Sequence, residues 1–83
     1  MFTKAFQLGV YSKDKIIYEG QVVSLIVPSV LGFLGILANH APLVAKLSSG
    51  KITMRARDGN TRVIDSSPGG FLEVLKNQVT LLL

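Results

Sequence analysis

Turn-forming residues recur along this chain at short, regular intervals, and this spacing limits what the chain can fold into. Between the turns lie runs of five to eight residues rich in Val, Ile, Leu, Phe and Thr. Runs of this kind form strands, and short strands separated by turns are typical of an antiparallel sandwich or barrel. No segment combines a helix cap with the apolar period of a helix, so no helix is expected. The turns are expected at residues 12–14, 19–20, 28–29, 39–42, 48–50, 58–60, 67–70 and 76–78.

Residues 51–57 form the clearest of these strands. Ile52, Met54 and Ala56 alternate with polar residues and therefore fall on one face of the strand. Residues 58–60 then turn the chain, since Gly and Asn tolerate the positive φ that a tight hairpin needs. The fold class predicted from the residues is all-β: an antiparallel β-sandwich or barrel of short strands, with no helical domain.

The chain has 83 residues, and no linker, repeat or low-complexity segment divides them. We therefore expect a single domain over residues 1–83. Within it, residues 21–27 are apolar on both faces, as expected for a central strand. Hydrophobic residues make up 48% of the chain, whereas a domain of this size buries only roughly 60–65% of its unfolded surface. The surplus predicts an exposed apolar patch that fits another protein.

The apolar content does not predict a membrane span. The longest apolar stretch, residues 30–38, has nine residues and is interrupted by Gly32 and Gly35, whereas a spanning helix needs about 20. No long apolar run follows Lys4, so no signal peptide is expected. The absence of Cys removes disulfides and thiolate metal sites together. From the residues alone, we expect a soluble cytoplasmic domain.

The residues also offer no catalytic group. His40 is the only histidine, and none of the five carboxylates is spaced to pair with it. One histidine without cysteine cannot build the usual zinc site, and Gly69-Gly70 precedes a strand rather than a phosphate-binding helix. We therefore expect no catalytic, cofactor-binding or metal-binding residue, and a protein that is not an enzyme. An accessory domain of a larger enzyme remains an alternative.

The net charge of +4 raises a second alternative, a small basic β-barrel that binds single-stranded nucleic acid. The basic residues cluster mildly, at Lys51, Arg55, Arg57 and Arg62. Proteins that bind single strands usually place stacking aromatics among such charges, and none of the aromatic residues falls within this cluster. A solvated strand face is the favoured interpretation.

Residues 32–43 form the most informative segment. Two glycines three residues apart flank large apolar residues, and an Asn-His-Ala-Pro loop then leads into another apolar run. In one interpretation the loop is purely structural and His40 satisfies backbone groups, as semi-buried histidines commonly do. In the other, a rigid loop presents the imidazole of His40 to a partner. The residues alone favour the first interpretation and leave both open.

The same segment resembles a known family. Gly32-x-Leu34-Gly35-Ile36-Leu37-x-x-His40-Ala41-Pro42-Leu43 is similar to the signature of the ε subunit of F-type ATP synthases, called δ in mitochondria. The flanking strands agree nearly from end to end. The matching motifs are Phe6-x-Leu8-x-Val10, Tyr18-Glu19-Gly20-x-Val22, Ile26-Val27-Pro28, Gly50-Lys51-Ile52, Gly69-Gly70-Phe71-Leu72-Glu73-Val74 and Asn77-x-Val79-Thr80.

The resemblance implies a flattened β-sandwich at the foot of the central rotor stalk. Such a domain binds the γ subunit and rests on the polar loops of the membrane c-ring, below the α/β head. It couples ion-driven rotation to ATP synthesis without touching substrate, and γ would cover much of the surplus apolar surface. The implied location is peripheral, on the cytoplasmic face of the cell membrane, and nucleic acid is not an implied partner.

The resemblance also implies which residues make contacts. The γ-facing loop of the family corresponds here to His40, Pro42 and Leu43. Family members usually continue beyond the last strand into a helical hairpin that can inhibit hydrolysis and in some cases binds ATP, whereas this sequence ends at Leu83. We therefore expect only the N-terminal β-sandwich domain, without the hairpin.

The ring-facing turn of the family corresponds to residues 28–35. Relatives often carry acidic or small polar groups in this turn, whereas this chain has apolar ones. Phe33 has little local core available and is expected to project outward. The implied c-ring contacts are Val30, Leu31, Phe33 and Leu34.

Overall fold

The computed structural model describes residues 4–83, which form eight strands and no helix. None of these residues belongs to a helix long and apolar enough to cross a membrane. The predicted all-β fold is therefore confirmed. The strands are β1 (Phe6–Tyr11), β2 (Ile16–Ser29), β3 (Gly32–Ile36), β4 (Leu43–Lys46), β5 (Gly50–Ala56), β6 (Thr61–Ser66), β7 (Phe71–Leu75) and β8 (Gln78–Leu82).

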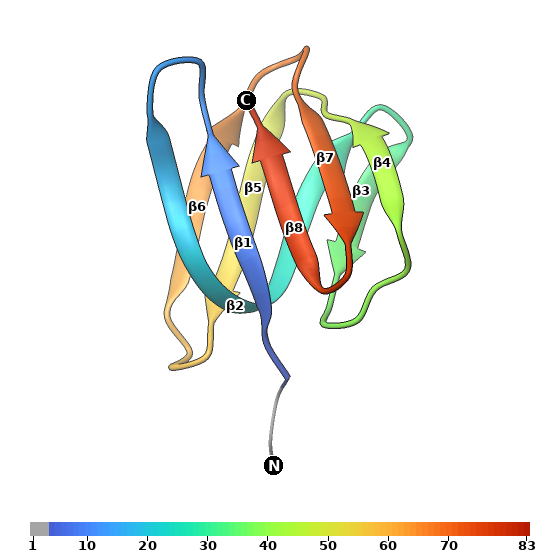
Figure 1. The fold of residues 1–83 in the computed structure, drawn as a ribbon. Coiled ribbons are helices and arrows are strands. Elements are labelled where there is room, and N and C mark those ends of the chain that lie inside the picture. Colours follow the sequence, from blue (N-terminus) through green and yellow to red (C-terminus); the bar gives the residue numbers. More distant parts are fainter. Residues whose placement is uncertain (1–3) are drawn as a thin grey trace.

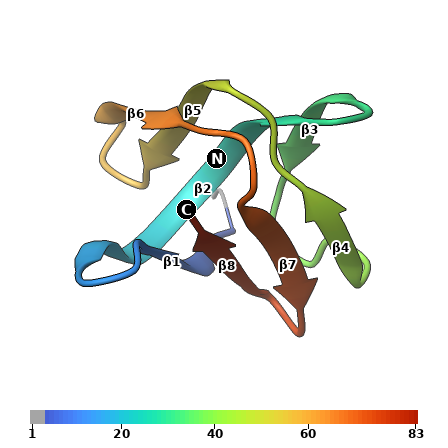
Figure 2. The same cartoon turned by 90° about the horizontal axis from the view of Figure 1, so that it is seen from above.

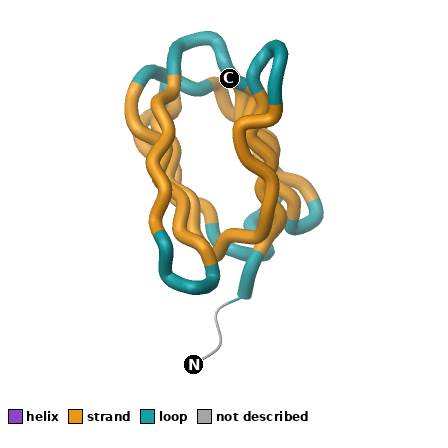
Figure 3. The backbone as a smooth tube through the Cα atoms, turned by 90° about the vertical axis from the view of Figure 1, so that its left-hand side faces the viewer, coloured by secondary structure: helices purple, strands orange, loops and turns teal. Residues whose placement is uncertain are grey.

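The strands pack in two layers, seen from the side in Figure 3. The first layer has the order β4, β7, β8, β1 and the first half of β2. The second layer consists of β3, the second half of β2, β5 and β6. β4 and β3 form one side of the sandwich, and β6 lies at the opposite side (Figure 1).

Strand β2 belongs to both layers, and Figure 2 shows it crossing from β1 toward β5 and β3. Its first half pairs with β1 as far as Val22, and its second half pairs with β5 and β3. The pairing with β5 shifts between Val22 and Ser24. Such a bulge bends a strand and increases its twist, and here it coincides with the change of layer. The consecutive residues Val22 and Val23 are both buried at this point.

Two turn expectations in β2 are wrong. Residues 19–20 lie inside the strand, where Gly20 provides space: a Cβ at this position would meet the Tyr18 hydroxyl at 3.0 Å. Residues 28–29 end the strand, and the turn follows at residues 30–31. The central segment 21–27 is also less buried than expected, since Ile26 is exposed.

The core lies between the layers and is built by strand alternation. In β5, Ile52 and Met54 are buried while Lys51 and Arg55 are exposed, which confirms the predicted face. β1, β2, β3, β7 and β8 also contribute buried residues, whereas the apolar residues with which β4 and β6 meet the core are only partly buried. The core cluster consists of Phe6, Leu8, Val10, Val22, Leu25, Val27, Ile36, Leu47, Ile52, Met54, Leu72, Val74, Val79 and Leu81.

One strand pair departs from the antiparallel arrangement. β1 and β8 are parallel neighbours, with Gln7 opposite Gln78 and Tyr11 opposite Leu82. The Leu83 amide continues the contact by donating to the Tyr11 carbonyl at 2.8 Å. The first and last of the described strands therefore meet in the middle of the first layer.

Gly70 should be among the least replaceable positions. Its carbonyl accepts the Leu47 amide at 2.9 Å, and a Cβ there would collide with the main-chain oxygen of Leu82. We expect Gly70→Ala to lower the free energy of unfolding by roughly 1–3 kcal/mol, the usual cost of overpacking. Urea denaturation measures it. Gly35→Ala is the control, because a Cβ at Gly35 meets nothing within 4 Å; equal losses in both variants would contradict the steric argument.

Candidate docking surfaces

The residues predicted to make contacts lie at the two ends of β3. The turn at residues 30–31 joins β2 to β3, and the loop at residues 37–42 joins β3 to β4 (Figure 1). A strand of five residues spans roughly 16 Å. The structure thus separates the two predicted contact elements instead of gathering them into one site.

We call residues 30–33 the hairpin tip; its large side chains are exposed and apolar. Leu31 is 90% exposed, Phe33 70% and Val30 59%, so Phe33 projects outward as expected. Leu34 differs, because it lies opposite the buried Val27 and packs against the core. Leu34 is therefore a packing residue rather than part of the exposed tip.

The hairpin tip is held by Ser29, which is only 4% exposed. Its hydroxyl donates to the Gly32 carbonyl at 2.6 Å and accepts the Leu31 amide at 3.2 Å. Gly32 follows with φ of 115°, a conformation that residues with a Cβ avoid. The Val30 amide also donates to the Lys46 carbonyl at 3.0 Å. These bonds fix how the apolar side chains are presented; the sequence identified Ser29 only as a turn residue.

At the other end of β3, residues 37–42 form what we call the His40 loop. His40 is half-buried, and its Nδ1 lies 2.7 Å from the Ala41 carbonyl. A carbonyl can only accept, so Nδ1 carries the proton, and in the neutral ring Nε2 is left as an acceptor. Pro42 is exposed, whereas Leu43 lies opposite the buried Val74 and packs against the core. The ring therefore contacts a backbone carbonyl, which is compatible with both interpretations of the loop, and Leu43 is a packing residue.

Exposed apolar side chains continue from these elements over both outer faces. In the second layer they include Phe33, Ile26 and Val63, which the strand registers place on one face. In the first layer, a hollow of about 180 Å³ is lined by Val44, Phe71, Leu72, Glu73, Thr80 and Leu82. The apolar surplus inferred from composition is therefore present at the surface.

The basic cluster is divided by the fold. Arg62 lies opposite the buried Met54 and points to the open side of the sandwich, where β6 ends the second layer. Arg55 points to the outer face instead. Lys51 is paired with the Asp65 carboxylate. These groups do not form one stripe, as a nucleic-acid surface requires.

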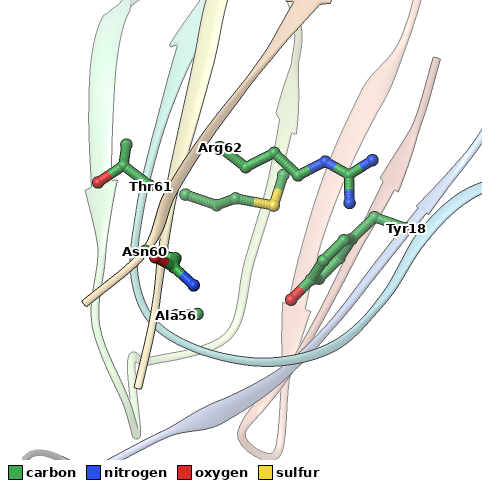
Figure 4. A pocket seen from close by; sticks show the side chains of 6 residues that line it. Tyr18, Ala56, Asn60, Thr61 and Arg62 are labelled. Carbon is green, nitrogen blue, oxygen red and sulfur yellow. The ribbon is translucent and has the colours of Figure 1, made fainter. Parts of the chain in front are cut away.

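Arg62 contacts an aromatic ring that the sequence does not place near it. Its guanidinium lies 5.4 Å from the centroid of the Tyr18 ring, above a hollow of about 240 Å³ (Figure 4). The hollow is lined by Tyr18, Met54, Ala56, Asn60, Thr61 and Arg62. Since the guanidinium already covers this ring face, the contact closes the open side of the sandwich rather than offering a platform for a base.

Tyr11 carries a perturbed hydroxyl. The Tyr11 hydroxyl donates to the Glu19 carboxylate at 2.8 Å, and this bond raises the pKa of Tyr11 above its usual value. The ring lies across Gly9, where a Cβ would collide with it. Within residues 4–83 no three His, Cys, Asp or Glu side chains come together as a metal site would require.

Comparison with known proteins identifies one family. The family described as ATP synthase, Delta/Epsilon chain, β-sandwich domain matches residues 5–83. The chain is 45% identical over 82 residues to the ATP synthase epsilon chain of Leptospira borgpetersenii serovar Hardjo-bovis, covering 99% of this chain but only 63% of that relative. It is 38% identical over 79 residues to the ATP synthase epsilon chain of Chlorobium limicola, covering 95% of this chain and 89% of that relative.

Two solved structures share the fold. One is a chain in the cryo-EM structure of the Euglena gracilis mitochondrial ATP synthase OSCP/F1/c-ring, with a TM-score of 0.86 at 24% identity, covering 99% of this chain and 52% of that chain. The other belongs to the Tetrahymena thermophila mitochondrial ATP synthase central stalk and c-ring, with a TM-score of 0.78 at 12% identity, covering 99% and 65%. At these identities the likeness concerns the fold alone.

The role of Ser29 in the hairpin tip can be tested directly. Ser29→Ala removes both hydroxyl bonds from a buried position, so we expect a loss of roughly 1–3 kcal/mol in the free energy of unfolding. We also expect faster hydrogen exchange at the Leu31 amide, measured residue by residue by NMR. Ser67→Ala, at an exposed serine, is the control. Unchanged Leu31 exchange in Ser29→Ala would show that the tip is held by other bonds.

Proposed function

This chain belongs to the family of ATP synthase delta/epsilon chains through their β-sandwich domain, and we propose that it is a central-stalk subunit of an F-type ATP synthase. In this role it docks on γ and on the c-ring and couples ion-driven rotation to ATP synthesis, without catalysing a reaction itself. The observation that carries the proposal is the family match over residues 5–83. The whole of residues 1–83 would act as one domain, at the cytoplasmic face of the membrane.

The geometry suits a subunit that bridges two partners. The hairpin tip and the His40 loop lie at opposite ends of β3, so one partner can bind at each end without excluding the other. β3 is joined to the rest of the second layer through β2. Torque applied at the tip would therefore pass through a paired strand rather than through a flexible linker.

We assign the His40 loop to γ. Leu37 and Pro42 are exposed parts of this loop, His40 is half-buried between them, and the exposed Val44 follows in β4. A half-buried imidazole with exposed apolar residues nearby in the sequence is a suitable centre for an interface, because a partner that covers them would exclude water around it. The acceptor Nε2 of His40 calls for a donor on the partner, such as a hydroxyl, an amide or a cationic side chain.

We assign the hairpin tip to the c-ring. Its exposed side chains, Val30, Leu31 and Phe33, are all apolar, so the contact would rest on burial of apolar surface rather than on ion pairs. Such a contact is little affected by salt. The nucleic-acid alternative is not retained, because Arg62 points away from the face that carries Arg55, Lys51 is paired with Asp65, and the relatives named above are ATP synthase epsilon chains.

Association with γ tests the proposal. The chain, tagged in its native organism, is expected to copurify with γ and with the α and β subunits. His40→Ala should weaken binding to γ by roughly 1–2 kcal/mol, as for a residue buried at the centre of an interface, while the melting temperature stays nearly unchanged. Titration calorimetry measures the affinity, and Thr61→Ala, on the far side of the sandwich, is the control.

The two results of the association experiment separate two claims. Recovery of the tagged chain without γ, α or β would contradict the stalk function. Wild-type affinity combined with a lower melting temperature in His40→Ala would show instead that the imidazole serves the fold of the loop.

Phe33→Asp tests the ring contact. A charge at the hairpin tip would be buried without a partner in the assembled complex, so we expect coupled ATP synthesis in membrane vesicles to fall several-fold. The isolated chain should keep its stability, because Phe33 is exposed. Val63→Asp is the control and should leave coupling intact. Val63 is an exposed apolar residue of β6 that lies on the same outer face of the second layer as Phe33. Equal effects of the two variants would point to a general loss of apolar surface.

A further inference from the structure

The His40 loop packs against the core through Ala38, and one side-chain hydrogen bond ties its middle to another segment. The Asn39 amide, directly before His40, donates to Oδ1 of Asn77 at 2.7 Å. In the described part of the chain, no main-chain hydrogen bond joins residues 38–41 to another segment. The bond to Asn77 is therefore the polar contact that fixes the middle of this loop.

Asn77 joins three segments that are far apart in the sequence. Its Nδ2 donates to the Ala5 carbonyl at 3.0 Å, and its own carbonyl accepts the Gln7 amide at 3.2 Å. Asn77 and Asn39 are 38 positions apart, and Asn77 and Ala5 are 72 apart. One half-buried amide thus connects the start of β1, the β7–β8 turn and the His40 loop, which lie at the same end of the sandwich (Figure 1).

The backbone conformation at Asn77 and at Asn39 suits a contact between the turn and the loop. Lys76 and Asn77 form a two-residue hairpin turn with φ of 50° and 60°, and Asn39 has φ of 62°. Asn is one of the few residues with a Cβ that adopts positive φ readily. The turn aims the Asn77 amide at the loop, and Oδ1 meets the Asn39 amide where the loop backbone reverses.

We propose that Asn77 is the positioning residue of the His40 loop, and that its Oδ1 sets the direction in which the imidazole is presented to γ. This inference rests on the proposed function for the partner, but not for the contact itself. The Lys76–Asn77 turn needs positive φ but does not need an amide, since Gly would satisfy it equally well. The amide is explained by the segments that it joins.

Three variants separate the bonds. Asn77→Gly keeps the backbone conformation and removes both side-chain bonds. Asn77→Asp keeps an acceptor for the Asn39 amide and removes the donor to Ala5. Lys76→Gly is the matched control in the same turn, because Lys76 also has positive φ and is exposed.

The first measurement is hydrogen exchange at the Asn39 amide in the full chain, by NMR. We expect Asn77→Gly to accelerate it roughly fivefold or more, the ratio that corresponds to one net hydrogen bond. Asn77→Asp and Lys76→Gly should keep the Asn39 amide protected. Equal exchange in Asn77→Gly and the wild type would overturn the proposal, and so would equal exchange in Asn77→Gly and Asn77→Asp.

The second measurement is affinity for γ by titration calorimetry. Asn77→Gly should weaken the affinity for γ by a similar ratio, and Asn77→Asp should keep the affinity of the wild type. Faster Asn39 exchange with unchanged affinity would leave Asn77 as the anchor of the loop but would contradict the assignment of the loop to γ. Weaker affinity with unchanged Asn39 exchange would overturn the positioning role and leave the γ assignment standing.

Discussion

Strand β2 runs through both layers of the sandwich, and the place of every candidate contact residue depends on it. Its first half is held by β1, and its second half lies between β3 and β5. Among the described strands β3 pairs only with β2, so the register from Leu25–Ile36 to Ser29–Gly32 fixes both ends of β3. A slip of one residue would turn Phe33 inward and Leu34 outward. The bulge near Val23 lies in the same strand, β2, that sets the orientation of the hairpin tip.

The parts of the fold that depend on neighbouring residues could be predicted from the sequence. Alternation in residues 51–57 identified β5, and the turn that follows it was placed correctly. Gly20 was misread because a glycine that makes room for a ring and one that makes a turn look the same in sequence. Only the position of the Tyr18 ring distinguishes them. The turn after β2 was placed two residues early, because Pro28 and Ser29 have turn propensity but here end a strand.

The candidate site could be predicted only in part, for a related reason. The outward direction of Phe33 could be predicted and the structure shows it, but the inward direction of Leu34 and Leu43 follows from their partners Val27 and Val74. Pairing partners of this kind lie outside the local pattern. The bond from Asn39 to Asn77 crosses 38 positions, and neither residue differs locally from an ordinary turn asparagine. Contacts that a fold makes between its turns are hidden from any analysis of one segment at a time.

The parallel pairing of β1 and β8 has a consequence for how the domain forms. β1 is synthesised before the other described strands, yet its neighbour on one side is β8, the last of them to be synthesised. The middle of the first layer therefore cannot close until residues 78–82 have left the ribosome. Until then β1 offers an unpaired edge, and its buried positions Leu8 and Val10 lack their partners Val79 and Leu81. Contacts between strands that are far apart in the sequence give a high contact order and slow folding, so the nascent domain is exposed to aggregation until β8 has been synthesised.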